Sequence, residues 1–199
     1  MNAINCRRYL YRFCIFMARE RKENMFYLAY YDAPVGRLLL AEQNGALAGL
    51  WIEGQKYFAR SLKDEETEEK DTAVLKQTKA WLDRYFKGEK PQVSELPLAP
   101  VGSEFQKVVW KLLCEIPYGE VTTYGAIAKK VAALRGIDHM SAQATGGAVG
   151  RNPISIIIPC HRLVGANGSL TGYAGGIEKK IWLLRHEGID TSKLKALGK

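Results

Sequence analysis

The sequence predicts an α+β fold, in which a small N-terminal antiparallel sheet with one helix precedes a mainly helical C-terminal half. Residues 25–52 read as short strands around Asn44 and Gly45, a dipeptide that strongly favours a β-hairpin. Residues 105–113 carry apolar side chains at helical spacing. The 199 residues suffice for one large or two small domains, and 47% hydrophobic with 25% charged residues is ordinary globular composition.

The first 24 residues form a basic extension to which we assign no function. Leu10, Phe13, Cys14 and Met17 have helical spacing, which is compatible with a short amphipathic helix. The apolar patch at 13–18 is short for the hydrophobic region of a signal peptide, and no clear cleavage site follows it.

Residues 25–100 are expected to form the N-terminal α+β domain. The predicted strands are Met25–Tyr31, Gly36–Glu42, Ala46–Ile52 and a returning strand at Val93–Leu98. The acidic, polar stretch at 64–71 predicts a solvated loop. A helix is expected over Thr72–Lys87, because its apolar residues fall on one face and Gly88 follows its end.

Pro97, Pro100 and Gly102 mark a linker to a second domain at 101–190, which a tail at 191–199 follows. Ser103 and Glu104 open the first expected helix of this domain. The later helices are expected at Tyr124–Ala133, capped by Thr122 or Thr123, at about Ser141–Val149, and at Ile177–Glu187. The first helix has a core-facing stripe made of Phe105, Val108, Val109, Leu112 and Leu113.

The second and third of these helices are joined by a tight turn at Gly136, which is typical of a helix-turn-helix motif, although many helical hairpins look similar. The third helix consists of small residues, with Gln143 as its one long side chain. Such a smooth helix can approach a narrow minor groove closely, and tight helix–helix packing also uses Ala and Gly.

The net charge of +8 is unevenly distributed. Residues 1–24 carry +4, with six basic and two acidic residues; residues 25–100 carry −2, with ten and twelve; and residues 101–199 carry +6, with thirteen and seven. A basic C-terminal half beside an acidic-leaning domain fits binding to a polyanion through one domain. A basic but merely solvated surface is the alternative.

The most informative pattern lies at 152–162, Asn-Pro-Ile-Ser-Ile-Ile-Ile-Pro-Cys-His-Arg. Residues Ile154–Ile158 predict a buried strand, Pro159 fixes the chain direction, and a cysteine, a histidine and an arginine follow in a row. An imidazole beside a thiol can help to remove its proton, directly or through water. The pattern therefore favours a thiolate nucleophile, while a small buried core residue is the alternative for Cys160.

The four cysteines are scattered, with no Cys-x-x-Cys pair, which argues against a zinc ribbon or a disulfide framework and for a reducing compartment. No apolar run approaches the roughly 18 residues of a membrane span. We expect a cytoplasmic protein without a membrane partner.

The sequence Ile-Pro-Cys-His-Arg-Leu is preceded by Asn-Pro and followed by Gly-Tyr-Ala-Gly-Gly and Trp-Leu-Leu-Arg-His-Glu-Gly. This combination resembles the O6-alkylguanine-DNA alkyltransferases, also called methylated-DNA–protein-cysteine methyltransferases, over about Phe105–Gly188. The resemblance implies a ribonuclease-H-like N-terminal domain and a winged-helix-like catalytic domain. It also implies DNA repair by irreversible, single-turnover alkyl transfer to Cys160.

The resemblance carries catalytic roles onto matching positions. Cys160 is the alkyl acceptor, and His161 and Glu187 deprotonate it through a bridging water. Asn152 braces the turn between the recognition helix and the active-site loop. Tyr124, at the start of the helix-turn-helix, donates a proton to the departing base and presses on the DNA backbone.

Substrate recognition follows in the same way. Leu163 and the Cys160 carbonyl receive the guanine amino group, Tyr173 walls the pocket, and the backbone N–H of Ala174 contacts O6. Many members have a serine where this chain has Ala174, but its role uses the backbone, so the loss should be mild.

Ala142, Gln143 and Arg151 are placed with Tyr124 at the DNA. Gln143 stands where many members have the arginine that fills the gap left by the extruded base. Glutamine lacks the charge, so we expect a looser hold on the duplex with the chemistry intact.

The implied partner is double-stranded DNA containing O6-alkylguanine, with O4-alkylthymine as a further candidate lesion, bound by a monomer. We expect no cofactor and no metal; some members have an N-terminal zinc site, but residues 25–100 contain neither Cys nor His. Two alternatives are a damage sensor, whose known forms lack the cysteine, and a Cys/His hydrolase, which needs an oxyanion site and a base remote in sequence.

Overall fold

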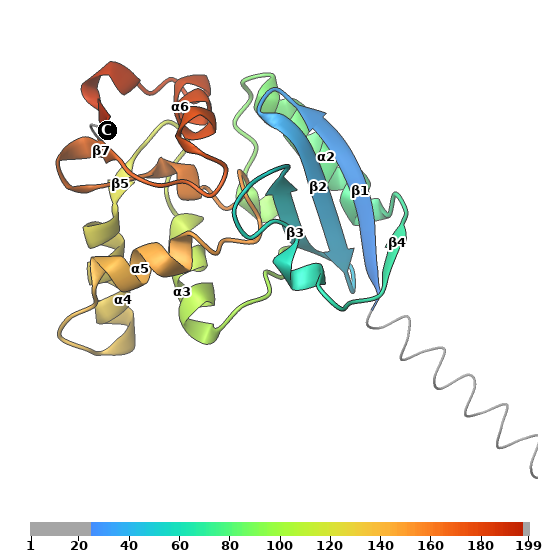
Figure 1. Cartoon of the computed structure of the whole chain (residues 1–199), viewed down its shortest axis with the longest axis horizontal. Helices are drawn as coiled ribbons and strands as arrows, with labels where there is room; N and C mark the ends of the chain where they lie inside the picture. Colours follow the sequence, from blue (N-terminus) through green and yellow to red (C-terminus); the bar gives the residue numbers. More distant parts are fainter. Residues whose placement is uncertain (1–24, 197–199) are drawn as a thin grey trace, which may run out of the picture.

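A sheet covered by one helix and a group of helices lying beside it make up the computed structural model, which describes residues 25–196 (Figure 1). The sheet contains β1 (Phe26–Ala33), β2 (Gly36–Gln43), β3 (Ala46–Ile52) and β4 (Thr67–Glu69) in the order β3-β2-β1-β4. Strands β1 to β3 are antiparallel, and β4 is parallel to β1. Asn44 and Gly45 have φ of 53° and 78°, as a tight hairpin turn requires. The α+β class is confirmed.

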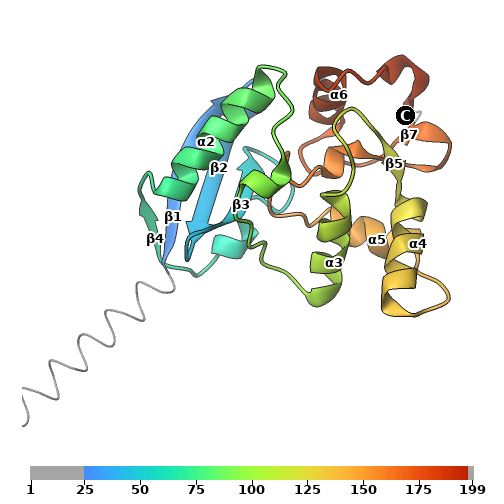
Figure 2. The same ribbon diagram turned by 180° about the vertical axis from the view of Figure 1, so that it is seen from behind.

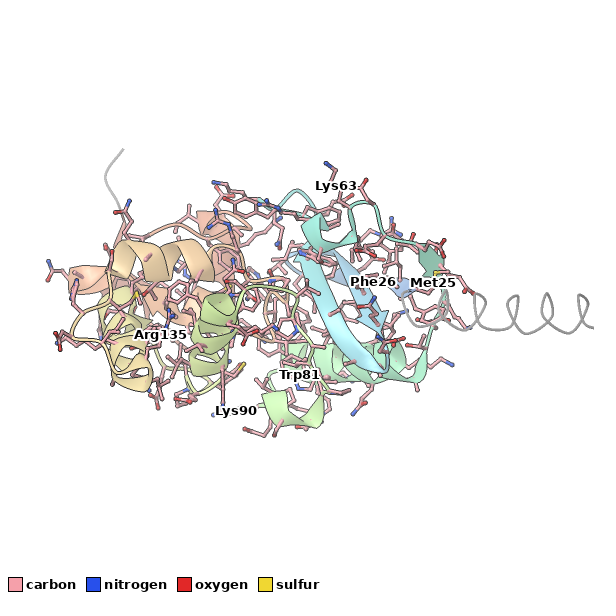
Figure 3. The ribbon with its side chains drawn as sticks, turned by 90° about the horizontal axis from the view of Figure 1, so that it is seen from below. Met25, Phe26, Lys63, Trp81, Lys90 and Arg135 are labelled. Carbon is pink, nitrogen blue, oxygen red and sulfur yellow. The ribbon has the colours of Figure 1, made fainter. Side chains whose placement is uncertain are left out.

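Helix α2 (Ala73–Phe86) covers one face of the sheet (Figure 2). The Thr72 hydroxyl caps its first turn by accepting from the Leu75 N–H at 3.3 Å, and Gly88 takes φ 84° beyond its end. Trp81 lies on the part of α2 nearer the helical half, whereas Met25 and Phe26 lie at the opposite end of the sheet (Figure 3). The helix predicted at Thr72–Lys87 is confirmed, because α2 covers Ala73–Phe86.

Two predictions for this half are wrong. The stretch at 64–71 is not all loop, because Thr67–Glu69 pairs with β1 as an edge strand whose side chains are exposed. Val93–Leu98 is not a strand but begins with a 3₁₀ helix, η2 (Val93–Glu95). The Glu95 carboxylate accepts from the Gln92 N–H at 2.7 Å, which caps the turn locally.

Between residues 101 and 196 the structure has four α-helices, as predicted. They are α3 (Glu104–Leu113), α4 (Tyr124–Arg135), α5 (Ala142–Val149) and α6 (Ile177–His186). Ser103, Thr123 and Ser141 cap the first three through their hydroxyls, and Gly136 ends α4 with φ 62°. Short strands and 3₁₀ turns lie between these helices: β5 (Thr122–Thr123), η3 (Cys160–Arg162), β6 (Leu163–Val164), η4 (Ala166–Gly168) and β7 (Ser169–Leu170). After α6 come η5 (Thr191–Lys193) and β8 (Lys195–Ala196), and the first half has one further 3₁₀ turn, η1 (Arg60–Leu62).

The two halves meet along β3, which forms one edge of the sheet. The Leu50 N–H donates to the Pro153 carbonyl, and the Ser155 N–H donates to the Leu50 carbonyl, both at 2.8 Å. Leu47 makes similar bonds to Pro97 and Ala99. These segments cover an edge that would otherwise expose unpaired backbone groups. One cluster of buried side chains contains residues of β1 to β3 and of α2 to α5, so the two halves share a core. The backbone bonds of Leu50 hold the loop that follows α5 against the edge of the sheet.

The predicted strand at Ile154–Ile158 is wrong. Only Ile154 bridges to β3, and the chain then coils through tight turns, with Ile158 N–H on the Ile154 carbonyl at 3.1 Å. Ile156 adopts φ 70°, a left-handed conformation that β-branched residues rarely take. None of the helices within residues 25–196 is long and apolar enough to cross a membrane.

Candidate active site

Asn152 clamps the loop that ends at Cys160. Its Oδ1 accepts from the Ile154 N–H at 3.0 Å, and its Nδ2 donates to the Ile158 carbonyl at 2.8 Å and to Cys160 Sγ at 3.2 Å. All of these groups are buried. One amide therefore holds the coiled loop in shape and points a donor at the sulfur, which stabilises a negative charge there.

Glu187, at the end of α6, is the centre of a buried hydrogen-bond network. Its Oε1 accepts from His161 Nε2 at 2.8 Å and from the Tyr85 hydroxyl at 2.8 Å. Arg162 donates through Nε to Oε2 at 2.8 Å and through Nη2 to Oε1 at 3.0 Å. The Gly119 N–H donates to Oε2 at 3.3 Å, from a backbone with φ 79° that favours glycine.

The Glu187 carboxylate carries the negative charge of this network. Burial acts to raise the pKa of Glu187, but its bonds to His161 and Arg162 outweigh burial and hold that pKa well below the usual range. Glu187 is therefore ionised at neutral pH and forms a bidentate pair with the Arg162 guanidinium.

His161 is fully buried and is oriented by this carboxylate. Because Glu187 accepts at Nε2, the neutral ring carries its proton there and keeps Nδ1 as an acceptor. Nδ1 is buried and has no hydrogen-bond partner among residues 25–196. Burial lowers the pKa of His161 against the pull of Glu187, so the ring is neutral at pH 7 and can take up a proton.

Cys160 is 6% exposed, and burial raises the pKa of its thiol. The Asn152 donor and the Lys180 ammonium act in the opposite direction. Lys180 is itself buried, donates to the carbonyls of Leu163 and Thr171, and has its pKa lowered by burial to about 8. The resting thiol is therefore protonated at neutral pH, and a thiolate requires a base nearby.

A cleft of about 690 Å³ opens beside α5, and we call it the α5 cleft. Its wall includes six of the residues predicted for substrate or DNA contact: Tyr124, Ala142, Gln143, Arg151, Tyr173 and Ala174. The glycine-rich side of α5, with Gly146 and Gly147, forms part of the same wall. These six predicted residues thus lie together on one surface.

The predicted catalytic residues other than Tyr124 are buried and do not line this cleft. Burial raises the pKa of both Tyr124 and Tyr173, and a negative charge on Cys160 would raise each of them further. The Tyr124 hydroxyl donates to the Gly172 carbonyl at 3.3 Å. Leu163 is fully buried outside the cleft wall, and its carbonyl already accepts from Lys180.

Sequence reasoning missed several partners in this site. The sequence shows Arg162 only as part of a polar run, and its second role, donation from Nη1 to the Ile116 carbonyl at 2.6 Å, carries no sequence signal. Tyr85 lies 102 residues before Glu187 and belongs to the other half of the chain. Lys180 could have been noticed, because α6 carries it beside a second lysine, but nothing local shows that it is buried.

Two family models match the chain. Residues 26–100 match the ribonuclease-like domain of 6-O-methylguanine DNA methyltransferase, and residues 104–189 match the DNA binding domain of the same family. The match covers both halves of the structure.

Individual relatives agree with this match. A methylated-DNA--protein-cysteine methyltransferase from Haemophilus influenzae is 41% identical over 163 residues, which are 82% of this chain and 87% of the relative. One from Methanosarcina acetivorans is 42% identical over 163 residues, 81% of this chain and 98% of the relative. The crystal structure of Mycobacterium tuberculosis OGT in complex with DNA is similar with a TM-score of 0.68 and 36% identity, covering 85% of this chain and 94% of that one.

Proposed function

The chain belongs to the methylated-DNA–protein-cysteine methyltransferase family, and from this premise we propose a role for each residue of the site. Its activity is the direct transfer of an alkyl group from DNA to one of its own cysteines, which repairs the DNA. We assign the acceptor to Cys160. The observation that carries this assignment is the buried relay Glu187–His161 beside the only sulfur that an oriented amide donor contacts among residues 25–196.

The relay removes the thiol proton. Nδ1 of His161 is the free acceptor, and the proton passes to it from Cys160 through a bridging water. Glu187 holds the ring in the tautomer that exposes Nδ1 and stabilises the imidazolium that forms, in the manner of a catalytic triad. The Asn152 amide and the Lys180 ammonium then stabilise the thiolate.

The lesion is O6-alkylguanine, rotated out of the duplex into the α5 cleft. Extrusion costs a few kcal/mol, which phosphate contacts offset. The small residues of α5 allow close approach to the minor groove, and Gln143 fills the gap left in the stack. The Ala174 N–H contacts O6, Tyr173 packs against the base, and the Cys160 carbonyl accepts from its amino group. The Leu163 carbonyl accepts as well, through the lone pair that the Lys180 ammonium leaves free.

Alkyl transfer then breaks the bond from O6 to the alkyl carbon and forms a bond from that carbon to sulfur. The electron pair of the broken bond stays on guanine, which takes a proton from the Tyr124 hydroxyl. The raised pKa of Tyr124 keeps the phenol protonated at neutral pH, so it has a proton to donate to the leaving base. No group in the site hydrolyses a thioether, so each molecule acts once.

Mass spectrometry tests this function. The protein is incubated with a duplex containing O6-methylguanine, and a matched duplex with guanine serves as the control. We expect a permanent gain of one methyl group, located at Cys160 by peptide mapping, only with the methylated duplex. Binding without a mass gain would indicate a damage sensor, and turnover of an ester would indicate a hydrolase; neither is favoured by the relatives.

We also propose that the chain acts as a monomer in the cytoplasm. Every residue assigned above comes from a single chain, and a thiol acceptor must stay reduced to react. Sedimentation with and without duplex tests the first point: one chain per lesion is expected, and a stable dimer would contradict it.

Gln143→Arg should tighten binding to the methylated duplex and steepen its salt dependence. An added cation that contacts one phosphate changes the slope of log affinity against log salt by about 0.9. Gln143 is exposed at the start of α5, where a longer side chain has room. Fluorescence anisotropy over a salt series measures both quantities; unchanged affinity would mean that this position does not enter the duplex.

A further inference from the structure

The loop between β3 and β4 belongs to the N-terminal half, yet it is bonded to the active-site segments. Gln55 is 5% exposed, and its Oε1 accepts from the Ile52 N–H at 2.8 Å and from the Ser155 hydroxyl at 3.0 Å. The Lys56 N–H donates to the Ala174 carbonyl at 2.9 Å. The loop therefore has a fixed position beside the wall of the α5 cleft.

The same loop holds an unusual backbone. Tyr57 and Ala59 have φ of 63° and 49°, left-handed conformations that side chains other than glycine rarely adopt. Such strain persists only where the surroundings fix it, and it clusters at sites where ligands bind. Here the anchors at Gln55 and Lys56 fix it, and the result is that the Tyr57 ring lines the α5 cleft.

Three cations lie over the ring of Tyr57. Lys56 Nζ lies 5.1 Å from the ring centroid, Arg60 Cζ 5.7 Å and Arg151 Cζ 5.5 Å. All three side chains are exposed, and none forms an ion pair with any residue between 25 and 196. The three cations repel one another, and cation–π attraction to a single ring offsets this repulsion only weakly. A bound anion would reduce the repulsion.

Tyr57 and Arg151 also separate two hollows. On one side is the α5 cleft, and on the other is a hollow of about 350 Å³ whose wall includes Arg60, Ser61 and Gln106. Arg60 and Arg151 both line this second hollow. Guanidinium forks match the geometry of phosphate oxygens, and hydroxyl and amide groups can add hydrogen bonds to them.

We propose that Lys56, Arg60 and Arg151, gathered around Tyr57, bind backbone phosphates of the same duplex whose lesion occupies the α5 cleft. We call this group the Tyr57 cluster. This proposal rests on the proposed function. It extends the DNA interface from the helical half onto the N-terminal half, although residues 25–100 carry more acidic than basic residues. Phosphate is the anion that suits these groups. The cleft beside them is also lined by residues of α5, the helix that we propose to bind DNA.

Binding to a methylated duplex over a salt series tests the proposal, with the Cys160→Ala background used to prevent covalent capture. Lys56→Gln and Arg60→Gln are each expected to weaken binding severalfold and to reduce the slope of log affinity against log salt by about 0.9 for each phosphate that the variant no longer neutralises. Arg60→Lys, which keeps the charge, is expected to retain the slope. Lys70→Gln is the matched control, because Lys70 also lies over a tyrosine, Tyr27, at 4.8 Å, but directly follows β4, the strand at the opposite edge of the sheet from β3 (Figure 1).

A second readout separates this proposal from the proposed function. With Cys160 present, the rate of methyl transfer from the duplex is compared with the rate from the free O6-methylguanine nucleobase, which has no phosphate. The ratio of the two rates should fall in Arg60→Gln and stay at the wild-type value in Lys70→Gln. An unchanged slope and ratio in Arg60→Gln, or an equal fall in Lys70→Gln, would overturn the Tyr57 cluster. Failure of the wild-type protein to take up methyl from either substrate would instead overturn the proposed function.

Discussion

Cys160→Ala should abolish methyl transfer completely while DNA binding is retained. The substitution removes the one atom that forms the new bond, and no neighbouring group can replace a thiolate as acceptor. Binding should persist because the side chains of the α5 cleft wall, rather than the buried sulfur, face the duplex. The loop should keep its shape, since the Asn152 amide still holds Ile154 and Ile158.

Cys114→Ala is the matched control for this experiment. Cys114 is the other free cysteine among residues 25–196, it is partly buried, and burial raises the pKa of its thiol to about 11. Removing it should leave transfer at the wild-type rate. Intact-mass measurement and fluorescence anisotropy read the two properties separately. Residual transfer by Cys160→Ala, or loss of binding with the fold intact, contradicts the assignment.

Glu187→Gln should produce the second-largest effect, on rate and stability together. Without the carboxylate, His161 loses the group that fixes its tautomer and stabilises its cation, and loss of such acid–base assistance typically costs about 10²–10⁴ in rate. The Arg162 guanidinium, only 7% exposed, loses its counter-charge. Breaking a buried ion pair in this way costs about 3–5 kcal/mol of stability.

The pH dependence of this loss has a defined sign. The pKa of Glu187 is depressed in the folded protein, so its contribution to stability is present above the pKa of an unfolded glutamate, about 4.3, and is lost as pH falls below it. The difference in unfolding free energy between wild type and Glu187→Gln should therefore be full at pH 7 and shrink below about pH 4. Urea unfolding at several pH values measures it; a difference that stays constant down to acid pH would contradict the role of the charge.

Tyr85→Phe distinguishes the charge of Glu187 from the number of its hydrogen bonds. It removes one donor at 2.8 Å and leaves the carboxylate paired with Arg162. A hydrogen bond to a charged group is worth about 1.5–3 kcal/mol, so the expected loss of stability is smaller than for Glu187→Gln. The rate should fall as well, but by less, because His161 keeps its partner.

The features that sequence predicted well are those decided within a few residues. The hairpin at Asn44 and Gly45 and the helix starts at Ser103, Thr123 and Ser141 follow from turn and capping chemistry, and the structure has them at these positions. The position proposed for the nucleophile is also readable, because a cysteine and a histidine after an apolar run is an uncommon combination.

The wrong predictions involve segments whose shape is decided by distant groups. Ile154–Ile158 has strand composition, but the side chain of Asn152 and the edge of β3 coil it instead. Residues 67–69 look like a solvated loop, yet β1 offers them a free edge. The bond from Tyr85 to Glu187 could not be predicted for the same reason, since Tyr85 comes from a helix in the other half of the chain.

The bond from Tyr85 to Glu187 means that neither half of this molecule is an interchangeable part. An engineer who exchanges the sheet-bearing half for that of another protein must preserve a phenol at this depth and angle, or the grafted chimera will carry a poorly aligned base. Natural recombination faces the same constraint, so the pair should be inherited together.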